Sequence, residues 1–375
     1  MLSIQKHKCG LLYSAFLGLG LLLATPALGG TIDADASNAA IFVYQRIGDD
    51  SVPQANISVD KFKAHIKELT AGGYNVVPLG KVIDALKAGE ELPQNTVALT
   101  FDGAFMSTFN NAVPLMEEAK LPYTIFYASD MIDRAMPTRM SWDQIKTLRR
   151  NSRVSIGILP SAYMHMAGRT PEQNAAIINK AIGRYKEQFG EDPAFFAYPY
   201  GEYSAALRQL VGKYSFKAAF GEQSGVAHPK ADFTALPRFI MTDAYGDLDR
   251  FRLTANALPL PVTDVMPEDM LITENPPLIG FTVAPELTDI SRLSCFVSGV
   301  GKVDLVKPGG NRVEIRLQEQ LVDRRTRLNC TLPDDVVIPG QSETWRWYGT
   351  QLITPYEGEG DEPEEEDEPG SVEEE

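Results

Sequence analysis

The first residue able to do chemistry is Asp102, which follows the apolar run Val97 to Phe101 in the stretch VALTFDGAFMSTF. A short apolar run that ends at Gly103 predicts a buried strand, with the carboxylate at its carboxyl end. In folds built from alternating strands and helices, residues at that end line the pocket where acids and bases work. Asp102 is therefore a candidate functional residue. The structural alternative is a helix N-cap, for which Asp is a favoured residue.

Two later groups also follow strand candidates. Tyr198, Pro199 and Tyr200 come after the apolar run 194–197; Tyr198 and Tyr200 could form an aromatic wall for a ligand, or could simply pack at the rim of the fold. His165 follows the candidate strand 153–158, where a histidine in a loop or helix start is the common case. His65 falls on a helix that we expect to lie at the surface.

The elements that would position these groups alternate between strands and helices from residue 39 to about 243. Ser141 and the pair Thr170-Pro171 carry typical helix start signals. The other elements follow from the hydrophobic periodicity, with strands expected at 39–44, 74–77, 97–101, 123–127, 153–158, 194–197 and 217–220. About seven such units favour a closed or nearly closed β/α barrel over an open sheet.

The pattern changes after residue 257. Proline-rich residues 258–277 predict a linker, and short strands with Gly-rich turns over 278–355 predict a small β-sandwich. Cys295 and Cys330 are the only cysteines after the leader and are expected to form one disulfide, with two free buried thiols as the alternative. Trp345 and Trp347 would share one strand face, either in the core or exposed for glycan binding.

The first 29 residues have the order of a secretory signal: a basic start, an apolar middle and a small-residue exit. We expect cleavage near Gly29 or Gly30 and a periplasmic or secreted mature protein of which 30–257 form the barrel. A buried N-terminal helix is the alternative reading. No other stretch is long enough to span a bilayer.

Most of the net charge of −15 lies at the other end of the chain, since residues 357–375 contain 12 acids and no base. Such a segment predicts a solvated, disordered tail over 356–375. The charge balance argues against nucleic acid as a partner, because nothing offsets the charge of phosphates.

An ordered series of landmarks makes the chain resemble a known family over residues 39–243. The landmarks are VYQR at 43–46, VALTFD at 97–102, LPYTIF at 121–126, SIG at 155–157, FAYPYG at 196–201 and LPRF at 236–239. In this order and spacing the chain resembles the polysaccharide deacetylases, that is, the NodB-homology domain of carbohydrate esterase family 4. The resemblance implies a distorted (β/α) barrel that acts on a polysaccharide or oligosaccharide.

The resemblance also implies a metal held by one Asp and two His, which would polarise a carbonyl and activate water. Asp102 matches the general base, but Gly103, Leu159 and Tyr163 stand at the three ligand positions. None of them is a usual ligand for zinc. Tyr198 to Tyr200 match a motif whose backbone N–H helps to form an oxyanion hole. The Arg usual in that motif has no match near Phe196.

We therefore expect a secreted deacetylase-like protein that binds an acetylated glycan without metal-dependent hydrolysis and without a cofactor. The alternative is an active N- or O-deacetylase with a rearranged site, in which His165 would help to bind Zn or another divalent metal. If the alignment is right, changing Gly103 to Asp together with Leu159→His and Tyr163→His should recreate metal binding.

Overall fold

The computed structural model describes residues 37–334 and 344–355. The chain divides into two compact units, Met1–Thr31 and Ile32–Glu375, and the described residues all belong to the second. The predicted signal peptide and the predicted acidic tail lie outside the described residues. No helix in the described ranges is long and apolar enough to cross a membrane.

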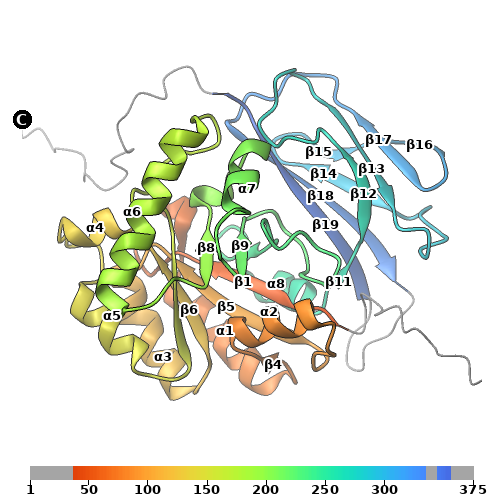
Figure 1. Cartoon of the computed structure of the whole chain (residues 1–375). Coiled ribbons are helices and arrows are strands. Elements are labelled where there is room, and N and C mark those ends of the chain that lie inside the picture. Colours follow the sequence, from red (N-terminus) through yellow and green to blue (C-terminus); the bar gives the residue numbers. More distant parts are fainter. Residues whose placement is uncertain (1–36, 335–343, 356–375) are drawn as a thin grey trace, which may run out of the picture. The chain divides into compact units, whose positions relative to one another are not determined.

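Eight parallel strands form the sheet that carries the candidate site (Figure 1). The strands are β1 (Ala40–Tyr44), β4 (Asn75–Val76), β5 (Thr96–Asp102), β6 (Tyr123–Tyr127), β7 (Val154–Ile158), β8 (Phe195–Ala197), β9 (Ala218–Phe220) and β10 (Phe239–Ile240). Their order is β10-β1-β5-β6-β7-β8-β9, with β4 paired to β5. The order confirms the predicted β/α architecture.

The two edges of the sheet are brought together by the segment around Leu236, which the sequence patterns did not predict. Leu236 pairs with Phe220 of β9 in a parallel bridge. In that bridge Gly221 N donates to Leu236 O at 3.0 Å. Leu236 lies just before β10, which pairs with β1 at the other edge of the sheet. The strands therefore form a nearly closed, distorted barrel.

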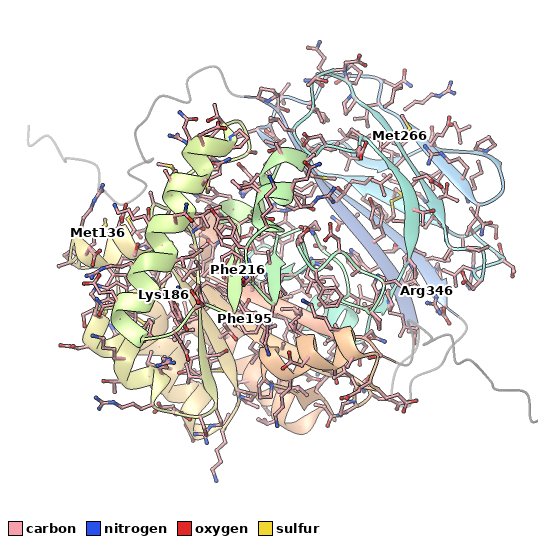
Figure 2. All side chains as sticks on the ribbon, viewed as in Figure 1. Met136, Lys186, Phe195, Phe216, Met266 and Arg346 are labelled. Atoms are coloured by element: carbon pink, nitrogen blue, oxygen red, sulfur yellow. A yellow bond between two sulfur atoms is a disulfide. The ribbon has the colours of Figure 1, made fainter. Side chains whose placement is uncertain are left out.

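Both faces of the sheet are buried, as expected for parallel strands covered by helices. Along β1, Phe42 and Tyr44 join one apolar cluster while Ile41 joins another. Phe195 of β8, labelled in Figure 2, contacts Phe220 with ring centroids 6.0 Å apart.

Eight α-helices accompany these strands in the described part of the chain. They are α1 (Val59–Ala71), α2 (Leu79–Ala88), α3 (Val113–Glu118), α4 (Ser129–Asp133), α5 (Trp142–Arg149), α6 (Pro171–Phe189), α7 (Ala205–Val211) and α8 (Leu248–Ala255). Ser141 and Thr170 each form a capping box, which confirms both predicted helix starts. Short elements are β2 (Arg46–Ile47), η1 (Pro53–Ala55), β3 (Asn56–Ile57), the π-helical turn η2 (Thr108–Ala112) and η3 (Pro199–Gly201).

His65 does not lie at the surface, contrary to the sequence expectation. It shares the buried face of α1 with Phe62, and its ring stacks on Phe251 at 4.1 Å. Nε2 lies 2.9 Å from Gly246 O and Nδ1 lies 3.0 Å from the Tyr44 hydroxyl. Since a carbonyl only accepts, Nε2 donates to it and Nδ1 accepts from Tyr44. His65 lies three positions after Phe62 along the helix, so the two side chains share one helix face.

Two further sheets follow the barrel, one antiparallel and one antiparallel except for its edge strand β11, which pairs in parallel with β19. The five-stranded sheet has the order β11-β19-β18-β14-β15 and the four-stranded sheet the order β12-β13-β17-β16. Their strands are β11 (Leu258–Pro259), β12 (Val262–Met266), β13 (Leu278–Val283), β14 (Ser294–Val297), β15 (Gly301–Val303), β16 (Leu305–Gly309), β17 (Arg312–Arg316), β18 (Arg325–Asp334) and β19 (Thr344–Ile353).

The two sheets share one apolar core, to which Phe281 contributes from one sheet and Leu328 from the other. This arrangement is sandwich-like, as the sequence predicts. The segment 258–277, predicted as a linker from its prolines, contains β11 and β12, one strand of each sheet. Pro259 is tolerated there because β11 is an edge strand.

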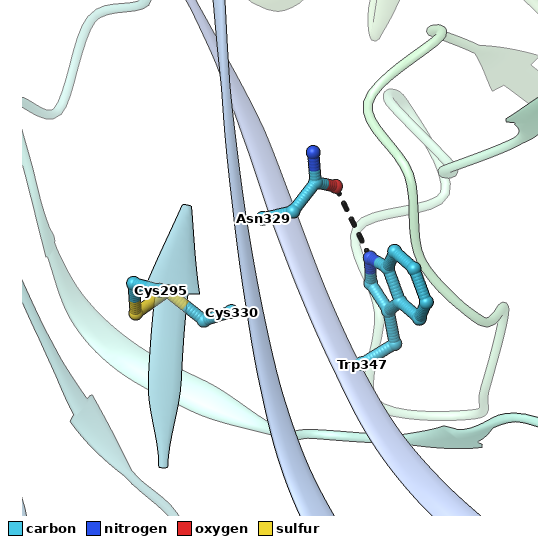
Figure 3. The surroundings of a disulfide bond; sticks show 4 residues. All are labelled: Cys295, Asn329, Cys330 and Trp347. Atoms are coloured by element: carbon cyan, nitrogen blue, oxygen red, sulfur yellow. Dashed lines mark hydrogen bonds between the residues drawn. A yellow bond between two sulfur atoms is a disulfide. The ribbon is translucent and has the colours of Figure 1, made fainter. Parts of the chain in front are cut away.

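Cys295 and Cys330 form the predicted disulfide (Figure 3). They sit directly opposite each other on the antiparallel strands β14 and β18. The bridge therefore links neighbouring strands within one sheet.

Candidate functional site at the barrel mouth

Asp102 ends β5 at the carboxyl edge of the sheet, as the sequence predicts, and is buried. Both of its oxygens accept hydrogen bonds from Arg238, with Nη1 at 2.8 Å from Oδ1 and Nη2 at 2.6 Å from Oδ2. Asp102 is not the N-cap of the following helical turn, because helical backbone begins only at Met106. Its carboxylate is thus held by a guanidinium rather than by a helix end.

Arg238 is itself fully buried and held in place by other groups. Its Nε donates to Gly221 O at 2.9 Å, and Nη1 also lies 3.2 Å from Thr100 Oγ1. Burial raises the pKa of Asp102, the positive charge of Arg238 offsets part of that rise, and Glu222 adds to it. Arg238 comes from the LPRF landmark at 236–239. The family pattern expects an Arg in a different motif, the one that Tyr198 to Tyr200 match.

Gly103, at the first ligand position, has a left-handed backbone with φ +97°. A Cβ at this position would lie 2.3 Å from Phe105 Cε2 and 2.9 Å from Arg139 Nη1. Arg139 covers the Phe105 ring at 3.7 Å and donates to Gly103 O. The space of a ligand side chain is therefore occupied by an aromatic ring and a guanidinium.

Leu159 and Tyr163, at the other two ligand positions, belong to one apolar cluster. Leu159 is fully buried, and the Tyr163 ring packs edge-on against Tyr200 with centroids 4.7 Å apart. Burial raises the pKa of the Tyr163 hydroxyl well above its ordinary value, and Glu222 adds to the rise. The phenol therefore stays protonated and is a poor metal ligand.

The donor set does not fit the metal that the family resemblance implies. Within residues 37–334 and 344–355, no three His, Cys, Asp or Glu side chains are grouped so that they could hold an ion. We therefore derive no reaction step through a metal.

His165 pairs with Glu202, a buried carboxylate that follows η3. The distance from Nδ1 to Glu202 Oε2 is 2.7 Å, and the imidazole stacks on the Tyr200 ring at 4.3 Å. Arg324 Nη2 lies 3.5 Å from the same carboxylate oxygen. His165 is thus oriented by a carboxylate that the motif analysis did not single out.

A third buried carboxylate, Glu222, lies two residues after the end of β9. Its Oε1 accepts from Gln45 Nε2 at 3.1 Å, and Arg327 Nη2 lies 3.7 Å from Oε2. Sequence reasoning missed Glu202, Glu222 and Arg238. The signal that could have found the two Glu residues is their position after predicted strands, the same signal that identified Asp102.

Tyr198, Pro199 and Tyr200, which match the family's oxyanion-hole motif, are packed inside the protein rather than exposed at its surface. Tyr198 is fully buried and donates its hydroxyl to Thr234 O at 2.8 Å. Pro199 and Tyr200 are also buried, and Tyr200 has a left-handed backbone with φ 55°. Tyr200 O accepts from Arg325 Nη1 of β18 at 2.8 Å and from Gln351 Nε2 of β19 at 3.3 Å. The C-terminal sheet thus covers this part of the mouth.

Trp347 of β19 is likewise part of the packing. Its ring meets Phe239 of β10 edge-on at 5.4 Å, and Nε1 donates to Asn329 (Figure 3). The Trp345 side chain is less buried than that of Trp347. An exposed aromatic pair is therefore not formed.

Comparisons with known proteins agree with the barrel. Residues 89–219 match the family model described as polysaccharide deacetylase. YxkH of Bacillus subtilis (strain 168), whose name describes a polysaccharide deacetylase, is 21% identical over 198 residues, which are 53% of this chain and 69% of its own. The poly-beta-1,6-N-acetyl-D-glucosamine N-deacetylase of Escherichia coli (strain K12) is 20% identical over 244 residues. That match spans 53% of this chain but only 36% of the E. coli protein.

The fold has a counterpart among solved structures. IcaB from Ammonifex degensii matches with a TM-score of 0.52 and 22% identity, covering 58% of this chain and 96% of that one. Residues 89–219 of the barrel are therefore similar to the polysaccharide deacetylase family. The two C-terminal sheets lie beyond the stretch that the family model matches.

Proposed function

We propose that the chain is an exported member of this family that binds a glycan without metal-dependent hydrolysis. The observation that carries the proposal is the set of residues at the three ligand positions: Gly103, Leu159 and Tyr163. A hydrolytic zinc site needs three protein ligands and an open position for water. Here one position has no side chain, one is aliphatic and one is a buried phenol.

The state of Asp102 supports the same conclusion. A general base must reach the proton that it removes, directly or through one water. Both oxygens of Asp102 accept hydrogen bonds from Arg238, and the side chain is 1% exposed. Its role in this account is to balance the charge of Arg238.

Glycan binding is proposed from the family and from the names of relatives. The matching E. coli protein is named for a polymer of N-acetylglucosamine, and an acetylated amino-sugar glycan is the class that we propose here. Export is proposed from the signal-like residues 1–29.

One observation favours a second candidate, an active deacetylase with a rearranged site. His165 is oriented through Nδ1 by the buried Glu202, an arrangement that general bases use. In this reading His165 rather than Asp102 would activate water.

Calorimetric titration with acetylated glucosamine oligomers tests the proposed function. We expect saturable binding that is unchanged by a chelator and by dialysis against zinc. Binding that requires added metal would favour the rearranged site, and the absence of any binding would refute the glycan-binding proposal.

A further inference from the structure

A cleft of about 950 Å³ lies beside the filled barrel mouth. One wall comes from the loop 223–237, which begins one residue after Glu222. The other walls come mainly from residues 259–268, 284–286 and 347–350 of the C-terminal sheets and their connections. Met266 of β12, labelled in Figure 2, is among the lining residues and is 46% exposed. This region has room for a ligand.

The residues that line the cleft carry more negative charge than positive charge. Arg208 and Asp232 pair with each other, Nη1 lying 3.2 Å from Oδ2. The remaining charged side chains of the lining are Lys230 and the three carboxylates of Asp264, Glu268 and Glu286. The three carboxylate residues are exposed, and among the described residues Glu268 and Glu286 have no ion-pair partner.

Uncharged groups of the lining suit a sugar. Three aromatic residues are among those that line the cleft, namely Tyr203, Trp347 and Tyr348, and the largely buried Tyr203 and Trp347 can offer only the exposed edges of their rings. Gln223 is 6% exposed, and its Nε2 donates to Ala235 O at 2.7 Å. Its buried Oε1 accepts no hydrogen bond from the described residues. A buried acceptor without a donor marks a place where a ligand group or water completes the structure.

We infer that this cleft binds a glycan whose amino sugars carry free ammonium groups, the de-N-acetylated form of the proposed ligand. The inference rests on the proposed glycan binding. It adds where on the protein the glycan binds and which charge its sugars carry. An ammonium gains Coulomb energy from three carboxylates, while a neutral acetamide gains none. Aromatic walls and an amide acceptor provide contacts to the sugar ring and its hydroxyls.

The test compares a glucosamine hexamer with its fully N-acetylated counterpart by calorimetry on the full chain. The cleft variant is Glu268→Gln with Glu286→Gln. The matched control is Glu274→Gln with Glu319→Gln, which removes the same charge from exposed residues outside the cleft lining. The acidic tail is present in every protein, so differences between variants report on the cleft.

We expect the free-amine hexamer to bind about tenfold more tightly than the acetylated one at low salt. The cleft variant should lose about fivefold to tenfold in affinity for the free-amine hexamer, and the control should lose less than twofold. Equal losses in both variants would overturn the inference, because only overall charge would then matter. If the acetylated hexamer binds the wild type and the cleft variant equally well, and the free-amine hexamer binds no more tightly than the acetylated one, the proposed function stands and this site is refuted. Absence of binding to both hexamers would refute the proposed function itself.

Discussion

Asp102 and Arg238 show how a residue of the family's catalytic motif can become part of the packing. Both side chains are buried, and they are joined by two parallel hydrogen bonds. Such a pair is stable only while both charges are present, because a lone buried charge is strongly unfavourable. At this scale the sequence predicted the place of Asp102, at the carboxyl end of β5. It did not predict Arg238, because nothing in a local pattern shows that two residues 136 positions apart will meet.

Replacing Asp102 with Asn should lower the free energy of unfolding by about 3–5 kcal/mol, since Arg238 keeps its charge without a counterion. Urea unfolding measures the change. The control is Asp84→Asn, which removes an exposed pair with Lys217 and should cost less than about 1 kcal/mol. Equal costs for both variants would mean that the Asp102 pair contributes nothing special to stability.

Gly103 should resist replacement for two separate reasons, its left-handed φ and the crowding by Phe105 and Arg139. We expect Gly103→Ala to cost at least about 1–2 kcal/mol of unfolding free energy. Gly183→Ala, in the open middle of α6, should instead stabilise the protein by about 0.5–1 kcal/mol. Thermal and urea unfolding of both variants make the comparison.

The same geometry changes the expectation for the restored triple variant. Gly103→Asp with Leu159→His and Tyr163→His places an Asp where a side chain clashes and two polar rings in an apolar cluster. We now expect loss of stability without stoichiometric zinc binding, measured by unfolding and metal analysis. A stable, zinc-loaded triple variant would show that the backbone at Gly103 can adapt.

At the scale of elements, periodicity and start signals predicted the barrel strands and the helices that open at Ser141 and Thr170. They failed where tertiary contacts decide. The closing bridge at Leu236 is a single residue pair without a periodic pattern, and β11 and β12 lie in a segment whose prolines indicated a linker. His65 was misplaced because a histidine on a helix gives no sign of which face its neighbours cover.

The packing of α1 on Tyr44 and Phe251 should make stability depend on pH through His65. Burial lowers the pKa of His65 to about 4. Between pH 6.5 and 4 the unfolded chain binds a proton that the folded chain does not, so this contribution falls as pH falls and is fully present above pH 6.5. We expect a loss of up to about 3 kcal/mol across that range. The measurement is urea unfolding of the wild type and of His65→Gln at several pH values. The unfolding free energy of the variant should lack this fall at low pH, because the variant has no imidazole at position 65. Parallel pH profiles for the two proteins would contradict the assignment.

For the whole molecule, the ordered landmarks predicted the barrel fold, and the short strands with Gly-rich turns predicted the sandwich-like sheets. What they could not show is how the C-terminal sheet meets the barrel. Arg324, Arg325 and Arg327 reach Glu202, Tyr200 O and Glu222, contacts between residues more than 100 positions apart. These contacts bury side chains at the barrel mouth, and the cleft beside it is open, which is why we propose that binding occurs in the cleft.

Acetate release from acetylated glucosamine oligomers, measured with and without added Zn, Co or Ni, tests the central claim most directly. We expect no release above a protein-free blank under any of these conditions, and no difference between the wild type and Asp102→Asn. Acetate release that requires metal and is abolished by Asp102→Asn would contradict it.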